Sequence, residues 1–172
     1  MKKAIALAIT LAVLSAIGSV AGADEKAAPA KKKAAAKAMA APMNPSDIQW
    51  GDAPPIFPAG AKFAVLMGDP GKAGPYTVRI KVPDGYKVGA HWHPADEVLT
   101  VISGTFNLGM GDKLDMSKGK ALTAGGFAVV SARMRHFAWA TGETEVQVHG
   151  PGPFKLIYVD PADDPTKGAA KK

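Results

Sequence analysis

The residues of this sequence best suited to chemistry are three histidines and one glutamate: His91, His93, Glu97 and His136. The first two histidines are separated by one residue, so on a β-strand both imidazoles project from the same face. A turn over Pro94–Asp96 then lets Glu97 open the next strand beside them, and His136 begins another strand after a long excursion. Imidazole and carboxylate groups converging on one face suit a divalent first-row transition metal ion with coordination positions left open.

Other interpretations of these residues also have to be considered. Two histidines on a strand are more often packed or solvent-exposed than bound to metal. Their joint spacing with Glu97 favours a metal site, because a carboxylate is rarely buried without a partner. Such a metal can also serve stability alone. The fourth histidine, His149, shares a strand face with Glu145 and Gln147 and is expected to be exposed and uninvolved.

Composition excludes several other chemistries. The chain of 172 residues has no cysteine, which rules out disulfides, thiolate nucleophiles, iron–sulfur clusters and zinc–thiolate sites. The net charge of +6 is concentrated in the tails, because residues 44–165 hold eleven Lys and Arg against thirteen acids and so carry −2. A nucleic-acid-binding domain would normally carry its positive charge on a folded face, so we expect no nucleic-acid partner.

The two ends of the chain predict export and tethers. In residues 1–23, two lysines, an apolar stretch and three small residues have the layout of a secretory signal peptide, cleaved after Ala23 to leave a periplasmic or secreted protein. The alternative is an uncleaved anchor, but the apolar stretch is short and weakly apolar for a span of about 20 residues, so we expect no stable membrane span. Residues 24–43 form an Ala/Lys-rich low-complexity linker, expected to be a disordered tether, and 161–172 a matching frayed tail.

The segment between the tails, residues 44–160, indicates an all-β domain. Short runs alternate apolar and polar residues with period two, and glycine or proline breakers separate them, which favours an antiparallel sandwich or barrel without convincing helices. Residues 46–75 carry a weaker signal and are expected to form an arm with one or two edge strands. The runs expected as strands are 76–82, 88–93, 97–102, 105–110, 127–131, 136–140, 145–149 and 154–159.

Over residues 76–160 the sequence resembles the cupin superfamily. The first cupin motif is Gly, five residues, His-x-His, three residues, Glu, six residues and Gly. Every spacing of that motif is met, by Gly85, His91, His93, Glu97 and Gly104. The motif is highly specific, because five positions agree across twenty residues.

The second cupin motif is met in part. Gly125 and His136 fit it, whereas Ser131, Arg133 and Ala140 stand where Pro, Gly and Asn are usual. The resemblance implies a double-stranded β-helix, or jelly roll, with one metal ion inside the barrel. Metals of cupins of this type are Mn, Fe, Ni, Zn or Cu, and many members are homodimers.

Period two also predicts what surrounds the metal. If His136 faces inward, Ala138 and Ala140 face inward behind it, and their small side chains leave space for a ligand. Phe137 and Trp139 then point outward, together with Trp92, as an aromatic patch that needs a cover. The residue 46–75 arm, another subunit or ordinary packing between two sheets would each supply one.

Four longer side chains are also candidates for the pocket. Met110 and Met134 are placed on its side; methionine is usually a gap-filling core residue, although a thioether near three imidazoles would favour copper. Arg133 and Arg135 flank the strand that enters the site. They would form a positive rim for a carboxylate or other anion, although such arginines are more often simply solvated.

These features predict a metal-dependent enzyme, oxygenase-like or isomerase/lyase-like, that acts on a small organic molecule outside the cytoplasm. Glu97 would be a metal ligand and, if it left the metal, a base. The competing hypothesis is a non-catalytic binder or sensor of metal or ligand, and a third is an interaction protein with a structural metal. The absence of a second identifiable acid or base favours the binder, and the small residues behind His136 favour a substrate cavity.

Overall fold

The computed structural model of the chain describes residues 42–168. The predicted signal peptide of residues 1–23 lies outside the described residues, as do the linker up to residue 41 and the final residues 169–172. The described residues belong to a single compact unit. Within them, no helix is long and apolar enough to cross a membrane.

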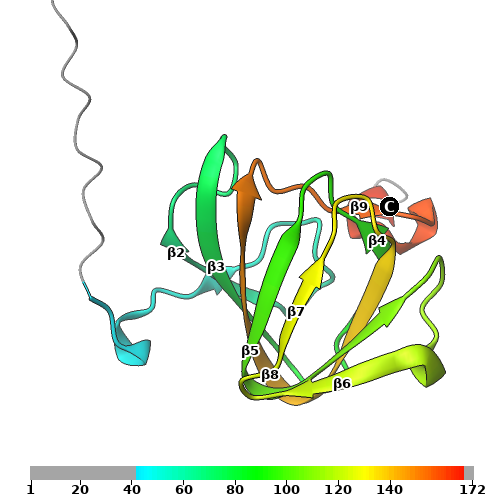
Figure 1. Ribbon diagram of the computed structural model, residues 1–172, viewed down its shortest axis with the longest axis horizontal. Coiled ribbons are helices and arrows are strands. Elements are labelled where there is room, and N and C mark those ends of the chain that lie inside the picture. The colour runs from blue at the N-terminus through cyan, green and yellow to red at the C-terminus, as the bar shows by residue number, and fades with distance from the viewer. Residues whose placement is uncertain (1–41, 169–172) are drawn as a thin grey trace, which may run out of the picture. The chain divides into compact units, whose positions relative to one another are not determined.

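Nine β-strands make up most of this unit, and they form one curled, antiparallel sheet (Figure 1). Six of the strands are hydrogen-bonded neighbours in the order β1-β2-β3-β8-β4-β9. Outside this path, β5 pairs with β6, β7 and β8. The strands are β1 (Gly51–Asp52), β2 (Lys62–Met67), β3 (Gly74–Val82), β4 (Lys87–Trp92), β5 (Glu97–Met110), β6 (Gly119–Thr123), β7 (Phe127–Val130), β8 (His136–Gly152) and β9 (Ile157–Tyr158). The all-β architecture predicted from the sequence is confirmed.

The two longest strands, β5 and β8, are each continuous where the sequence predicted two separate strands. β5 runs on through Ser103 and Gly104, and β8 runs on through Gly142, because the strands bend at these points without leaving their shared ladder. Gly104 has φ +76°, and a Cβ atom there would collide with the carbonyl oxygen of Glu143, so this corner requires glycine. β5 and β8 thereby pass from one layer of the barrel to the other.

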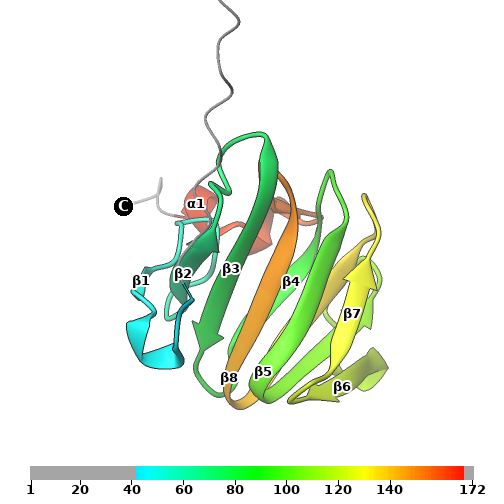
Figure 2. The same ribbon diagram turned by 60° about the vertical axis from the view of Figure 1, so that its left-hand side comes forward.

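The first layer contains β1, β2, β3, the end of β8, the start of β5 and β7, which lie side by side in Figure 2. The start of β8 pairs instead with β4 and with the end of β5, and β9 and β6 flank these strands in the second layer. Two curled layers made from continuous strands are the arrangement of a jelly roll.

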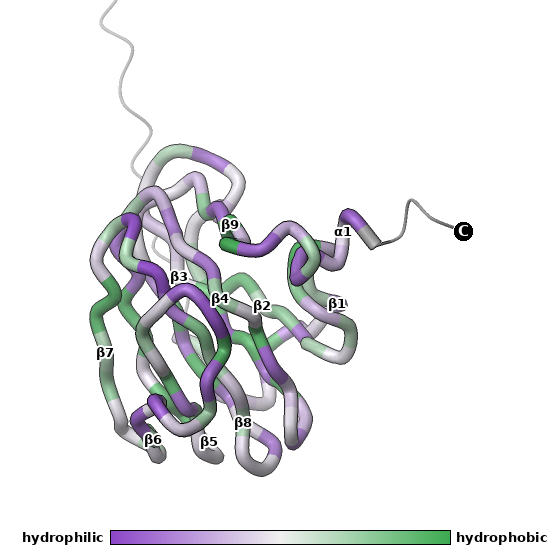
Figure 3. Tube along the Cα trace, turned by 90° about the vertical axis from the view of Figure 1, so that its right-hand side faces the viewer, coloured by the Kyte–Doolittle hydropathy of each residue, from purple (hydrophilic) through white to green (hydrophobic). Residues whose placement is uncertain are grey.

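The core lies between these layers. The period-two prediction for β3 is confirmed, because its four inward residues are all at most 8% exposed: Tyr76, Val78, Ile80 and Val82. Burial of each aliphatic side chain of this size contributes about 1.5–3 kcal/mol. At the edge of the first layer, β7 consists only of apolar residues and is coloured green in Figure 3.

The prediction for the residue 46–75 arm is confirmed, whereas the prediction for the C-terminal tail is not. β1 and β2 supply the edge strands expected in residues 46–75. The tail from Pro161 onward was expected to be frayed, but residues 161–168 form a 3₁₀ turn, η3 (Pro161–Asp163), and a helical turn, α1 (Pro165–Gly168). The carboxylates of Asp160 and Asp164 hold these turns by accepting hydrogen bonds from Ala162 N and Thr166 N.

Phe137 and Trp139 of β8, which were predicted to point outward, are both covered within the domain, and Trp139 also lines the internal cavity. Phe137 and Trp139 are 0% and 7% exposed and form a small cluster with Ala90. A Cβ atom at Gly109 would collide with the Phe137 ring, and one at Gly119 with the Trp139 ring, so β5 and β6 lie directly against these aromatic faces. The cover is therefore packing within the barrel rather than the residue 46–75 arm.

Candidate metal centre

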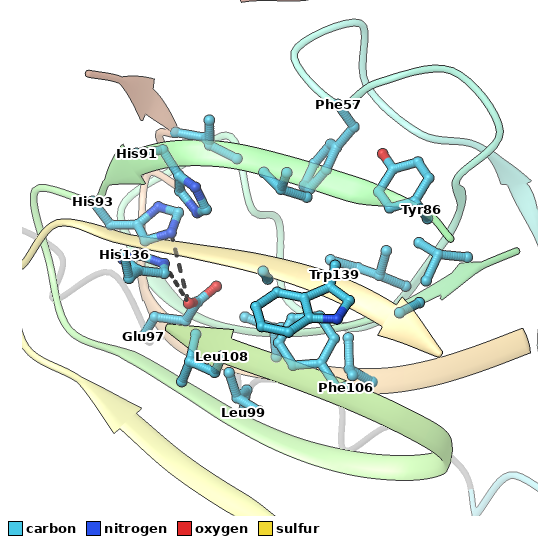
Figure 4. A pocket seen from close by; sticks show the side chains of 18 of the residues that line it. Phe57, Tyr86, His91, His93, Glu97, Leu99, Phe106, Leu108, His136 and Trp139 are labelled. Carbon is cyan, nitrogen blue, oxygen red and sulfur yellow. Dashed lines mark ion pairs between the residues drawn. The ribbon is translucent and has the colours of Figure 1, made fainter. Parts of the chain in front are cut away.

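Three strands bring the four predicted ligands together (Figure 4). His91 lies on β4 and His93 directly after it, Glu97 is the first residue of β5, and His136 is the first residue of β8. Because β4 and β8 are antiparallel neighbours, His91 and His136 are paired across the ladder. The ligand nitrogens of His91, His93 and His136 all lie within 4.8 Å of one another.

Glu97 completes this group from the side of β5. Its Oε2 atom lies 3.6 Å from Nε2 of His93 and 3.5 Å from Nε2 of His136. Both contacts are drawn as dashed lines in Figure 4. All four residues are buried, with exposures of 9% or less. The site is therefore shielded from bulk water, which strengthens electrostatic interactions inside it.

The other ring nitrogen of each histidine is fixed by the backbone. Nδ1 of His91 donates to the carbonyl oxygen of Gly89 at 2.8 Å, and Nδ1 of His93 donates to that of Lys155 at 2.7 Å. Nδ1 of His136 donates to the carbonyl oxygen of Met134 at 3.0 Å. A carbonyl accepts only, so each Nδ1 carries the proton, and each Nε2 of the neutral ring presents a lone pair. Such outer hydrogen bonds orient histidine ligands of metals.

Burial disfavours the protonated form of two of the three imidazoles. Burial lowers the pKa of His91 to about 3, with a further contribution from His136 and His93. Burial likewise lowers the pKa of His93. For Glu97, burial acts to raise the pKa, but His136 and His93 outweigh it and lower the pKa to about 2. The side chain of Glu97 is therefore an anion at neutral pH.

This donor set fits a metal cation. The Nε2 lone pairs and a carboxylate oxygen face one another, and acceptors that face one another repel unless a cation lies between them. In the described part of the chain, Nε2 of His93 is also the one buried side-chain nitrogen or oxygen without a hydrogen-bond partner. A divalent first-row ion would supply that partner and balance the charge of Glu97.

The two turns that carry the ligands are bonded to each other. The backbone N–H of Arg133 donates to the carbonyl oxygen of His93 at 2.7 Å. The N–H of Ala132 donates to Oδ1 of Asp96, also at 2.7 Å. The strand entering His136 is therefore positioned by the turn between β4 and β5. Asp96 was not predicted as a site residue, because a turn aspartate is common and its partner is remote in sequence.

An apolar cavity begins at the metal site and continues into the barrel. Its volume is about 50 Å³, which is room for a few water molecules. Ala138 and Ala140 line it behind His136, together with Leu99 and Leu108 of β5. The predicted space behind His136 is thus present, and Glu97 lines the same cavity.

The four longer side chains predicted for the pocket do not line this cavity. Met110 and Met134 are 45% and 44% exposed, because they stand at the end of β5 and in the turn before β8. Arg133 and Arg135 are exposed in the same turn, and Nη1 of Arg135 pairs with Oδ1 of Asp112 at 3.0 Å. The inward–outward alternation that places Ala138 and Ala140 does not extend into a turn, so it could not place these residues.

Comparisons with known proteins agree with the fold. No protein-family model and no curated protein matches this sequence. Among solved structures, the polyketide cyclase RemF from Streptomyces resistomycificus is similar with a TM-score of 0.61 at 15% identity, covering 77% of this chain and 94% of that one. A protein from Methylibium petroleiphilum PM1 assigned as an acetylacetone dioxygenase has a TM-score of 0.57 at 20% identity, covering 80% and 98%.

A third similar structure is an RmlC-like cupin from Shewanella frigidimarina, with a TM-score of 0.50 at 21% identity, covering 63% of this chain and 87% of that one. At these identities the similarity concerns the fold. The described part of the chain has the double-stranded β-helix fold of the cupins, as its sequence motifs indicate.

Proposed function

We propose that His91, His93, His136 and Glu97 bind one divalent first-row transition metal ion, Mn, Fe, Ni, Zn or Cu. The observation that carries this proposal is the orientation of the three imidazoles, whose Nδ1 atoms are bonded to carbonyls while their Nε2 atoms converge. The chain pre-orients these ligands with its own backbone, so little reorganisation is needed when the ion binds.

We further propose that the ion and its cavity bind a small organic molecule and act on it, by an oxygenase-like or an isomerase/lyase-like reaction. When bound, the ion supplies Lewis acidity or, if it is redox-active, a means to react with dioxygen. Glu97 lines the cavity as a carboxylate, so its Oε2 is placed to accept a proton from a bound molecule when it does not coordinate. The names of the two structures with the higher TM-scores, a cyclase and a dioxygenase, support an enzyme as the first hypothesis.

A non-catalytic binder is the second candidate, and one observation favours it. Among the described residues that line the cavity, Tyr86 is the one further titratable side chain beyond the four proposed ligands, and its hydroxyl is already donated to the carbonyl oxygen of Pro58. An enzyme that needs a second acid or base would have to take it from the substrate or water.

The metal content of the purified protein tests the proposal. Wild type is expected to carry close to one equivalent of metal, and Glu97→Gln clearly less, because it loses the anionic ligand. His149→Ala is the matched control, since His149 lies on β8 outside the cluster. Wild type that binds no stoichiometric metal after incubation with each of the five ions would refute the metal centre. Oxygen uptake with candidate diketones or diols then separates a redox enzyme from a binder.

Export is a separate proposal. The sequence layout of residues 1–23 supports a signal peptide cleaved after Ala23. The intact mass of the protein from a periplasmic or culture fraction should correspond to a chain that starts at Asp24. A chain that retains residues 1–23 in that fraction would contradict cleavage.

A further inference from the structure

One aromatic side chain, Phe57, closes the cavity away from the metal site. In Figure 4 the Phe57 and Tyr86 rings lie opposite the cluster of His93, His136 and Glu97. Phe57 lines the cavity and is 8% exposed. It belongs to no strand, because it is carried by the loop between β1 and β2. A loop side chain therefore supplies part of the wall of a barrel cavity.

The loop that carries Phe57 is compact. Its ends are joined by a hydrogen bond from Ala53 N to Ala61 O at 3.3 Å, and Phe57 N donates to Pro54 O at 2.9 Å within it. Between these ends the sequence contains three prolines, which restrict its backbone. Closely spaced ends and internal bonding are the features of an Ω-loop, a type of loop that is frequently functional.

Two buried tyrosines hold Phe57 from inside the barrel. Tyr158 donates its hydroxyl to the carbonyl oxygen of Ile56 at 2.9 Å, and Tyr86 donates to that of Pro58 at 2.8 Å. These are the carbonyls immediately before and after Phe57. Burial raises the pKa of Tyr158 to about 12 and also raises that of Tyr86, so both remain donors at neutral pH.

Phe154 connects Phe57 to the metal site, because its ring contacts both Phe57 and His93. Its ring stacks parallel to that of Phe57 at 6.0 Å between centroids and lies 5.2 Å from the ring of His93. The next residue, Lys155, accepts the hydrogen bond from Nδ1 of His93. Phe57 is therefore one aromatic ring away from a proposed metal ligand.

The lining between these two ends is apolar. Its polar groups are those of the four proposed ligands, the engaged hydroxyl of Tyr86 and the indole N–H of Trp139. The remaining lining residues are aliphatic or aromatic, and among the described residues no lysine or arginine lines it. A charged group placed there would lose its hydration without gaining a charged partner, and a molecule with several hydroxyls would leave most of them without one. A sugar, or an acid with a second charge, is a poor fit for such a lining.

We propose that the site takes a small molecule that is apolar beyond its metal-binding end, and that Phe57 is a specificity-determining residue that limits the length of this molecule. The inference rests on the proposed metal centre for the polar end of the ligand. It is independent of which reaction follows.

Straight-chain hydroxamic acids, which chelate first-row metals through two oxygens, test the length limit on metal-loaded protein. Wild type is expected to bind acetohydroxamic acid and to bind hexanohydroxamic acid no better. Phe57→Ala should gain at least about tenfold in affinity for the longer probe, because two or more additional methylenes become buried. Phe63→Ala is the matched control, since Phe63 contacts Phe57 at 6.1 Å between centroids but does not line the cavity. Isothermal titration calorimetry measures each affinity.

Two results with these probes would overturn the proposal. One is the same dependence on chain length in Phe57→Ala as in wild type. The other is wild-type binding of succinic monohydroxamic acid, whose tail is charged, as tightly as butyrohydroxamic acid. Phe57→Leu should show a smaller gain than Phe57→Ala and provides the same comparison if the alanine variant does not fold.

A metal-free arm separates this inference from the metal centre. Removing the ring of Phe57 should enlarge the cavity towards the ~150 Å³ at which a dry apolar cavity binds benzene. Metal-free Phe57→Ala, but neither wild type nor Phe63→Ala, should therefore show saturable benzene binding by NMR. Should no variant bind metal, the proposed centre fails and this arm alone decides the role of Phe57. A folded Phe57→Ala that binds no benzene would refute it.

Discussion

Two turns position candidate ligands at the metal site, and they are stabilised in different ways. The turn between β4 and β5 keeps every spacing of the first cupin motif and positions His93 and Glu97. The turn between β7 and β8 has Ser131 and Arg133 at the usual Pro and Gly positions, yet His136 still reaches the other imidazoles. Hydrogen bonds to the first turn keep the second turn in the position that places His136 at the site.

Arg133 shows what this arrangement costs. Its φ of +64° makes it the one non-glycine residue with positive φ in the described part of the chain. For a residue with a Cβ atom this conformation costs about 1–2 kcal/mol relative to the right-handed region. The bonds from Arg133 N to His93 O and from Ala132 N to Asp96 Oδ1 offset that cost. Contacts with the neighbouring turn thus hold a backbone conformation for which the motif usually has glycine.

The largest expected effect comes from removing one ligand on each turn. His93→Ala and His136→Ala should each lower metal affinity by more than about 100-fold, because loss even of a residue that only supports a ligand can cost 10–100-fold. Equal losses of metal affinity in the two variants would show that His136, on the altered turn, binds the metal as strongly as His93. Competition with a fluorescent chelator measures both, with His149→Ala as control. Unchanged affinity in His136→Ala would restrict the site to the first turn.

An intermediate effect is expected where the turns are joined. Asp96→Ala removes the acceptor of Ala132 N–H and should lower the free energy of unfolding by about 1–2 kcal/mol and the metal affinity by roughly tenfold. Urea unfolding and the same chelator competition measure the two quantities.

Asp112→Ala is the control for this substitution, because Asp112 forms an exposed pair with Arg135 and touches neither turn bond. It should change both quantities little. If Asp96→Ala behaved like Asp112→Ala, the turn joint would contribute nothing to the site.

The smallest expected effect is a gain in stability. Arg133→Gly restores the usual residue of the motif at a left-handed position and should raise the free energy of unfolding by about 0.5–1 kcal/mol, after the entropy cost of glycine. The midpoint of urea unfolding should rise. Arg135→Gly, in the same turn but without positive φ, should not gain stability. A gain in both variants would mean that the effect is unrelated to the backbone conformation.

The same contrast explains how much of the fold and site was predictable. Strand alternation identified the inward face of β3, and motif spacing identified four residues that lie together, since both depend on local geometry. The continuation of β5 through Gly104 was not predictable, because glycine in a strand and glycine in a turn look alike in sequence. β6 was missed because its short segment has no clear alternation.

Residues that act through distant partners were also out of reach. Phe57 lies in a proline-rich segment without strand signal. Tyr86 and Tyr158, which bond to the carbonyls on either side of it, lie far from it in the sequence. The carbonyl groups that fix the three Nδ1 atoms leave no trace in side-chain identity. Met110 and Met134 were misplaced because they stand at a strand end and in a turn, where alternation no longer assigns a face.

The continuity of β5 and β8 has a consequence for the kinetics of the metal. Glu97 and His136 are the first residues of the two longest strands, and those strands belong to both layers of the barrel. Separating these ligands by local unfolding would therefore disrupt ladders in both layers at once, an opening close in free energy to global unfolding. Metal exchange that requires these ligands to separate should therefore be slow, and the amides beside the ligands should be among the most protected from hydrogen exchange.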